Sequence, residues 1–139
     1  MRVKKDAQVS VEYMALIGFV TLITIPLVII YSTYSQQSKE SITSAQIHQV
    51  AKKIVDAAES VYYLGEPSQT TLKVNIPDDV VDVDLSYGYE VVFKVKSTSG
   101  ISDIVQVSSV NITGSLPTNR SSYSIIVKAL SDHVEVSYR

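Results

Sequence analysis

The feature that most limits the fold of this chain is a run of residues, 13–38, without a single charged side chain. Its central part, 13–31, reads YMALIGFVTLITIPLVIIY and is apolar apart from two threonines and the terminal tyrosines. About 20 such residues cross the hydrocarbon core of a bilayer as a helix, and tyrosines at both ends suit the headgroup region. The run therefore predicts a membrane-spanning helix that is apolar on every side, unlike the one-faced helix of a soluble domain.

The residues that flank the run predict its orientation. The basic residues Arg2, Lys4 and Lys5 precede it near the N-terminus, and Asp6 beside them offsets their charge only in part. By the positive-inside rule the N-terminus stays cytoplasmic and residues 39–139 are exported. Residues 31–36, YSTYSQ, offer no convincing small-residue site of the kind that ends a standard secretory signal. We therefore expect the apolar run to remain part of the mature protein, unlike a secretory signal that is cleaved off.

Two residues in or beside the run do not suit a plain membrane anchor. Glu12 stands at its edge, where an unpaired carboxylate is costly and usually marks function. Pro26 lies inside the run, where it removes one backbone donor and loosens the helix. The plain alternatives are a carboxylate that reaches the headgroup layer and a proline that a membrane helix tolerates.

The segment around Glu12 carries a motif. Residues 4–16 read KKDAQVSVEYMAL. This resembles the archaeal type IV pilin-like precursors with a class III signal peptide, whose pattern is Q-x-S-x-E-x-x-x-L. The fixed positions of that pattern are occupied by Gln8, Ser10, Glu12 and Leu16, and the basic pair Lys4 and Lys5 stands upstream. The resemblance covers the motif and the apolar run that follows it.

The resemblance implies that a prepilin peptidase cleaves the bond between Ala7 and Gln8 on the cytoplasmic side, before the apolar run. Residues 1–7 would be the signal peptide, and the mature chain would have 132 residues (139 − 7). Its 9 basic (12 − 3) and 13 acidic (14 − 1) groups give a net charge near −4. Glu12 would then pair with the N-terminal amine of a neighbouring subunit, since opposite charges in an apolar bundle are tolerable when paired. Cyclisation of Gln8 to pyroglutamate would remove that amine and leave Glu12 a hydrogen-bonding role.

Behind the membrane or filament-core segment, 8–38, the pattern becomes that of an amphipathic helix over residues 39–66. Its apolar residues recur mostly every three or four positions: Ile42, Ile47, Val50, Ile54, Ala57, Val61 and Leu64. Gly65 and Pro67 predict its end. The polar stretch 32–41, STYSQQSKES, leaves open whether one helix runs from about residue 9 to residue 64.

Residues 67–139 favour strands and form the expected exported domain. Alternating patterns at Leu72, Val74 and Ile76 and at Val81, Val83 and Leu85 predict two of them. Residues 87–96 and 104–112 predict two more, and 124–130 with 133–138 predict a hairpin about residues 131–132. Five or six short strands after one long helix predict an α+β fold, a small antiparallel sandwich packed on the helix, as in a pilin lollipop.

The composition excludes several kinds of site. The chain has no cysteine, which excludes disulfides, zinc ribbons and thiol nucleophiles, and its two histidines, His48 and His133, exclude a three-histidine metal centre. A net charge of −2 argues against nucleic-acid binding. Asp82 and Asp84 alternate with valines, as on the solvated face of a strand, and lack calcium-loop spacing. We expect no catalytic residue, no metal and no cofactor.

Two sequons lie in the part expected to be exported. They are Asn111-Ile112-Thr113 and Asn119-Arg120-Ser121, and both fall in or near turn-rich sequence. Surface exposure of such a motif suits N-glycosylation. Asn111 and Asn119 are therefore the candidate glycan acceptors.

The residues and the resemblance together lead to one expected function. The chain would be a structural pilin of an archaeal type IV pilus-like surface filament, a membrane precursor first and an extracellular filament later, with a role in attachment. Its partners would be other copies of itself, the prepilin peptidase, the pilus assembly platform and the membrane. The alternatives are a minor pilin or pseudopilin of a filament-initiating or secretion-like machine, and a membrane-anchored binding domain that never polymerises. An archaellin is disfavoured by the start at Gln8, Val9 and Ser10.

Overall fold

The structure, a computed structural model, describes residues 3–139, with side chains from Val9 onward. Its elements follow the chain in this order: α1 (Val3–Leu64), β1 (Gln69–Ile76), β2 (Val80–Asp84), β3 (Glu90–Ser97), β4 (Gly100–Val107), β5 (Ile112–Gly114), β6 (Ser121–Ala129) and β7 (Val134–Tyr138). The expected α+β class is confirmed. The chain divides into two units, Met1–Lys39 and Glu40–Arg139, which are described separately below.

Helix α1 continues through the polar stretch 32–41, because every residue of that stretch is helical. The sequence had left open whether the stretch interrupts the helix. Ser32 and Thr33 donate their hydroxyl protons to the carbonyls of Val28 and Ile29, four residues back. These side chains therefore compete little with the backbone ladder that defines the helix. The stretch also contains no glycine or proline to interrupt it.

The end of α1 lies where the sequence predicted it. Gly65 has a φ of 79°, and its N–H donates to the carbonyls of Val61 at 3.2 Å and Tyr62 at 3.0 Å. A residue in the left-handed region that satisfies the last carbonyls is the usual way to end a helix, and glycine adopts this φ without strain. Pro67 follows a cis peptide bond with Glu66.

The compact unit Glu40–Arg139 uses one face of α1 as part of its core. The buried helix residues recur at three- and four-residue spacings: Ile47, Val50, Ala51, Ile54, Val55, Ala58 and Val61. The prediction was wrong at both ends of this stripe. Ile42 is 59% exposed because a five-residue spacing rotates it about 140° from Ile47. Leu64, in the last turn of the helix, is 76% exposed.

Two sheets complete the unit, one with strand order β1-β6-β7-β5 and one with order β2-β3-β4. The predicted hairpin of β6 and β7 is confirmed, and Val74 and Ile76 of β1 are buried as their alternation indicated. The prediction of one strand over 104–112 was wrong. That segment ends β4 at Val107 and begins β5 at Ile112, and β5 pairs with β7 in parallel, so the four-stranded sheet is mixed.

A bulge in β2 explains another departure from the predicted pattern. The register moves from Val80 opposite Val95 to Asp82 opposite Lys94, which inserts Val81 as an extra residue. Val81 is consequently 51% exposed, whereas Val80 and Val83 pack against the core. The alternation of Val81, Val83 and Leu85 therefore does not hold at Val81, because a bulge breaks the two-residue period.

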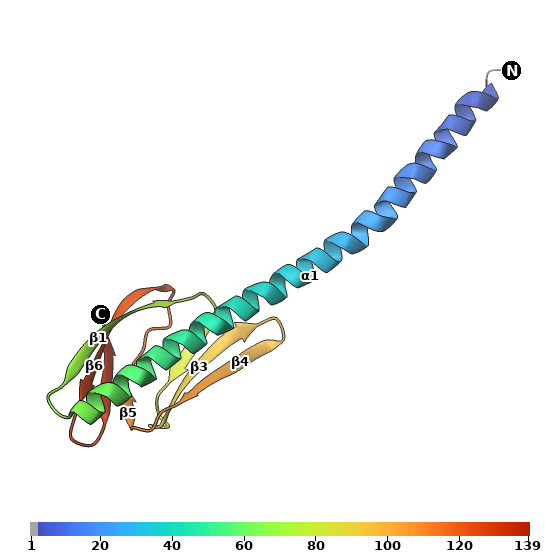
Figure 1. The fold of residues 1–139 in the computed structure, drawn as a ribbon. Helices are drawn as coiled ribbons and strands as arrows, with labels where there is room; N and C mark the ends of the chain where they lie inside the picture. The colour runs from blue at the N-terminus through green and yellow to red at the C-terminus, as the bar shows by residue number, and fades with distance from the viewer. Residues whose placement is uncertain (1–2) are drawn as a thin grey trace. The chain divides into compact units, whose positions relative to one another are not determined.

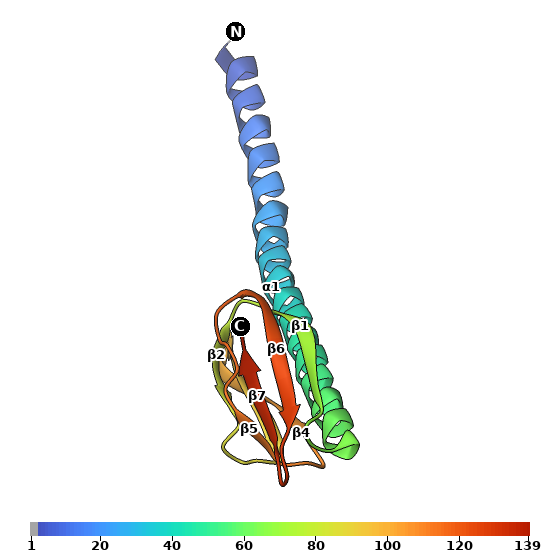
Figure 2. The same cartoon turned by 90° about the vertical axis from the view of Figure 1, so that its left-hand side faces the viewer.

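The core lies between the two sheets and the C-terminal part of α1 (Figures 1 and 2). Its largest fully buried side chain is that of Phe93 on β3, and Ile54 of α1, Ile125 of β6 and Val134 of β7 are also fully buried. One continuous cluster thus includes side chains from the helix and from both sheets. Neither sheet buries its apolar face without the helix, which is why Glu40–Arg139 forms one unit.

Two carboxylates of α1 bind the turns at the two ends of β4. Glu40 accepts hydrogen bonds from the Thr98 backbone nitrogen (2.6 Å), the Thr98 hydroxyl and the Ser97 hydroxyl (3.2 Å). Glu59 accepts from the backbone nitrogen and the hydroxyl of Ser109. The hydrogen bonds from Thr98 hold the pKa of Glu40 below its usual value, and those from Ser109 do the same for the pKa of Glu59.

Candidate membrane and assembly segment

The segment 9–34 of α1 exposes its apolar side chains in all directions. Every large apolar residue in it is exposed, for example Phe19 at 66% and Leu22 at 70%. The helix is apolar and long enough to cross a membrane, and no part of its most apolar stretch is buried. A surface of this size is not stable in water, so it needs lipid or protein around it.

The threonine hydroxyls and that of Ser32 within this segment are satisfied inside the helix itself. Thr21 donates to the carbonyl of Ile17 at 2.8 Å, and Thr24 donates to that of Val20 at 2.8 Å. Ser32 and Thr33 at its C-terminal end do the same. Because these four hydroxyls already have partners, they demand no polar group from the surroundings of the helix. It therefore suits lipid and an apolar protein bundle equally well.

Two residues modify the backbone of the segment. Pro26 lies inside α1 and has no N–H, so the carbonyl of Leu22 receives no helical hydrogen bond from it. Gly18 has no heavy atom within 4 Å of the position that a Cβ would occupy. Gly18 thus lets another helix approach the backbone closely, and Pro26 marks where the helix bends most easily.

The structure places the motif residues on α1. Ser10, Glu12 and Leu16 are exposed, and the four-residue spacing puts Glu12 and Leu16 on one face. Lys4, Lys5, Ala7 and Gln8 belong to the same helix, but their side chains lie outside the described residues. The backbone at the expected cleavage bond between Ala7 and Gln8 is helical.

The aspartates and the two histidines are distributed over separate ion pairs, an exposed helix position and a turn. Asp82 forms an ion pair with Lys94 (3.1 Å), and Asp78 forms one with Arg120 (2.5 Å). His48 is exposed on α1, and His133 Nδ1 lies 2.5 Å from Asp132 Oδ1 in the turn before β7. Among the residues that the structure describes, no three His, Asp or Glu side chains are grouped to hold a metal ion.

The two candidate glycan acceptors differ in accessibility. Asn119 is exposed in the bend between β5 and β6. Asn111 is half-buried before β5, and its side-chain Oδ1 is inaccessible and accepts no hydrogen bond. A Cβ added to Gly88 would lie 2.7 Å from that oxygen, which shows how closely the loop before β3 covers the Asn111 amide.

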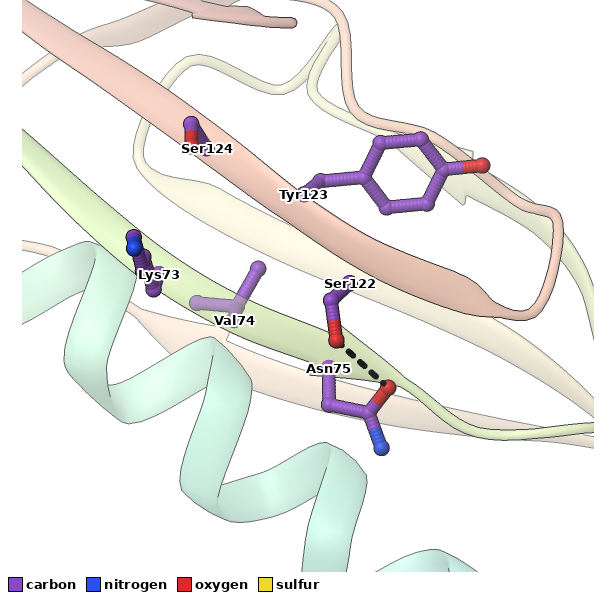
Figure 3. Close-up of a pocket in the computed structure, with 6 residues that line it drawn as sticks. All are labelled: Lys73, Val74, Asn75, Ser122, Tyr123 and Ser124. Atoms are coloured by element: carbon purple, nitrogen blue, oxygen red, sulfur yellow. Dashed lines mark hydrogen bonds between the residues drawn. The ribbon is translucent and has the colours of Figure 1, made fainter.

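Sequence reasoning missed a basic hollow beside β1. Lys53 of α1 and Lys73 of β1 line a hollow of about 310 Å³ together with Gln46, Gln49 and Asn75. Lys73 and Asn75 also border the neighbouring hollow over β1 and β6, where Asn75 Oδ1 accepts from the Ser122 hydroxyl at 3.4 Å (Figure 3). The two lysines are 20 positions apart (73 − 53) in different elements, so no local pattern could have indicated their proximity.

Comparison with known proteins adds no relative. No model of a protein family matches the chain, and no curated protein and no solved structure is similar to it. The class is therefore defined by the fold and the exposed segment: an α+β protein whose N-terminal helix could span a membrane.

Proposed function

We propose that this protein is a structural pilin-like subunit of an archaeal type IV pilus-like surface filament. In this proposal the prepilin peptidase cleaves the bond between Ala7 and Gln8, and the assembly platform moves the apolar helix from the bilayer into a bundle of identical helices. The observation that carries the proposal is the wholly exposed apolar segment 9–34, whose first turns contain the motif residues Ser10, Glu12 and Leu16.

The chemistry of the segment suits both a lipid bilayer and a helical bundle. In a bilayer its exposed side chains contact lipid, and its hydroxyls stay bonded to its own carbonyls. In a filament the same side chains contact other copies. Helices that leave lipid for a bundle gain little from hydrophobicity and associate through close packing, to which Gly18 contributes. A helix with a polar stripe would suit only one of the two environments.

Glu12 has a specific role in this proposal. It is the charged group at the N-terminal margin of the uncharged run, and its side chain is exposed on α1. In the bundle its carboxylate pairs with the amine that cleavage creates on a neighbouring subunit, or accepts a hydrogen bond if Gln8 has cyclised. A charge in apolar surroundings needs such a partner, so incorrectly placed subunits are disfavoured.

The unit Glu40–Arg139 forms the outer part of the filament and makes the contacts with surfaces or cells. A second function is favoured by one observation: a single apolar helix also suffices to anchor a binding domain that never polymerises. A minor pilin or pseudopilin would share the same N-terminal segment. Abundance in sheared surface filaments separates the major pilin, which dominates them, from a minor component.

The first test is the intact mass and the N-terminal sequence of the protein isolated from its cells. Cleavage at Ala7–Gln8 predicts a chain that starts at Gln8, or at its pyroglutamate form. An intact Met1, or a cut after Tyr31, would contradict the proposal.

The second test is the variant Glu12→Ala, measured by its amount in sheared filaments. The matched control is Asp56→Ala, which removes one exposed carboxylate from the same helix. The proposal predicts that only Glu12→Ala is lost from filaments while both variants remain in the membrane. Equal behaviour of the two variants would favour the anchored binding domain.

A further inference from the structure

Two surfaces of the unit Glu40–Arg139 carry opposite charge. On the β1 side, α1 contributes Gln46, Gln49 and Lys53, and β1 contributes Lys73 and Asn75; we call this surface the basic flank. Lys53 and Lys73 are exposed, and of the described residues that line its hollow none is acidic. The basic flank thus presents two ammonium groups and three amides without a carboxylate of its own.

On the β4 side the outward face of the sheet β2-β3-β4 is acidic. Val91, Phe93 and Val95 point into the core, so alternate residues of β3 and their partners point outward. Four carboxylates and two lysines lie on this outward surface, which we call the acidic face: Asp82, Asp84, Glu90, Asp103, Lys94 and Lys96.

The ion pairing on the acidic face leaves an excess of negative charge. Lys94 lies between Asp82 and Asp103 in the register and binds Asp82 at 3.1 Å. Asp103 is exposed, on a strand that also exposes Ile101 at 65% and Val107 at 64%. Exposed β-branched residues beside a carboxylate that shares its lysine with two other aspartates are typical of a contact surface with an apolar part and a charged rim.

Hydrogen bonds show that β4 and the basic flank lie on different sides of α1. Glu40 and Glu59 bind the turns at the two ends of β4. Lys53, six residues before Glu59, is rotated about 120° from it around the axis and lines the hollow with β1. The two surfaces share no residue, so one molecule can use both at once.

We propose that copies of this chain dock side by side, with the acidic face of one copy seated on the basic flank of the next. The proposal rests on the filament function above and names the contact that the units Glu40–Arg139 make within it. Its chemical basis is complementary charge: carboxylates in excess on one surface and unpaired ammonium groups on the other. Because the two surfaces differ, the contact is heterologous and can repeat without closing, as a filament requires.

A charge-swap experiment tests the contact in the full chain. Lys73→Glu and Asp103→Lys each place like charges opposite each other, and we expect each variant alone to be lost from filaments. The double variant Lys73→Glu with Asp103→Lys restores the pair with reversed sign, and we expect incorporation to return. Lys128→Glu changes the net charge as Lys73→Glu does, on β6 outside both hollows, and serves as the control. Thermal unfolding of each purified variant verifies that the fold persists.

Cross-linking tests the same contact without a charge reversal. The chain has no cysteine, so Lys73→Cys with Asp103→Cys introduces the only thiols. The two positions lie on different sheets, which stack about 10 Å apart, and a disulfide requires Cα atoms closer than about 7 Å. Oxidation of assembled filaments should therefore give a ladder of covalent multimers. The pair Lys128→Cys with Asp103→Cys should remain monomeric.

The outcomes separate this contact from the filament function itself. If the wild-type chain forms no filament, the proposed function fails. If it forms filaments while the charge variants are incorporated normally and the ladder is absent, the function stands and the docking is overturned. Failure of the double variant to recover, with no ladder, also overturns the docking.

Discussion

Glu59 of α1 accepts two hydrogen bonds from Ser109, one from the backbone nitrogen at 2.9 Å and one from the hydroxyl at 2.8 Å. The residues are 50 positions apart in the sequence, and Ser109 follows the end of β4. Glu40 binds the turn at the other end of the same strand. Charged hydrogen bonds therefore attach the helix to both ends of β4, in addition to the contacts of the apolar core.

Glu59→Ala removes both of these hydrogen bonds. We expect it to lower the free energy of unfolding by about 1 kcal/mol, below the upper range for charged hydrogen bonds because the carboxylate is near solvent. Denaturant unfolding of the full chain in a mild detergent measures this. A double-mutant cycle with Ser109→Ala should show coupling, and simple additivity of the two changes would contradict the pairing.

Stability should fall in acid because of Glu40 and Glu59. Their pKa values in the folded chain lie below the ordinary 4.5, so they stabilise the fold above that pH and lose this contribution as the pH falls through the folded pKa. The pKa of Lys94 is raised by its hydrogen bond with Asp82, and its contribution is lost only as the pH rises above 10.5. Lys94 itself thus stays protonated throughout the acid range.

The measurement is the midpoint of urea unfolding between about pH 6 and about pH 3. We expect the wild-type midpoint to decrease over this range and the variant Glu40→Gln with Glu59→Gln to show a flatter profile, because it has two fewer carboxylates to protonate. Asp84, whose pKa is lowered by hydrogen bonds from Ser86, remains in both chains. Identical profiles for the two chains would show that the helix carboxylates are not responsible.

Ile54 and Ile42 lie on the same helix and differ only in which face they occupy. Ile54 is fully buried, so Ile54→Ala should cost about 2–5 kcal/mol in unfolding free energy. Ile42 is 59% exposed, and Ile42→Ala should change stability by less than about 0.5 kcal/mol. Chemical denaturation of both variants provides the comparison. A large loss for Ile42→Ala would mean that the helix face is assigned incorrectly.

The sequence was sufficient to predict the elements whose residues follow a regular period. The apolar run, the helix end at Gly65 and the alternation of β1 each depend on neighbours within a few positions. The exposure of Val81 could not be predicted, because a bulge is set by the register with Val95 and Lys94 of another strand. The parallel pairing of β5 with β7 likewise depends on where a three-residue strand meets a distant one.

The candidate segment was similarly predictable in part. Its apolar character follows from consecutive residues, and the motif that includes Glu12 and Leu16 is also a local sequence pattern. The basic flank was not predictable, since Lys53 and Lys73 approach each other only when α1 and β1 are placed on one core. The hydrogen bonds between Glu59 and Ser109 could not be predicted either, because these residues also meet only in the folded chain.

Glycosylation, in a cell that modifies the exported chain, should occur at Asn119 and not at Asn111. A transferase needs the side-chain amide in an accessible loop, and Asn119 is exposed whereas the Asn111 Oδ1 is covered. Mass spectrometry of the cell-derived protein should show a glycan that Asn119→Gln abolishes and Asn111→Gln leaves in place. A glycan mapped to Asn111 would imply transfer before the β-sheets fold.

Gly114 should tolerate no side chain. It has a φ of 122°, and a Cβ added there would lie 1.9 Å from the carbonyl oxygen of Val136 in β7. Gly100 has a comparable φ of 135°, but no heavy atom lies within 4 Å of the position that a Cβ of residue 100 would occupy. Gly100→Ala therefore carries only backbone strain, about 1 kcal/mol, whereas Gly114→Ala adds a clash with a ladder carbonyl and should cost about 3 kcal/mol or more. Thermal unfolding of the two variants measures the difference, and equal losses would show that β5 does not pair with β7 as described.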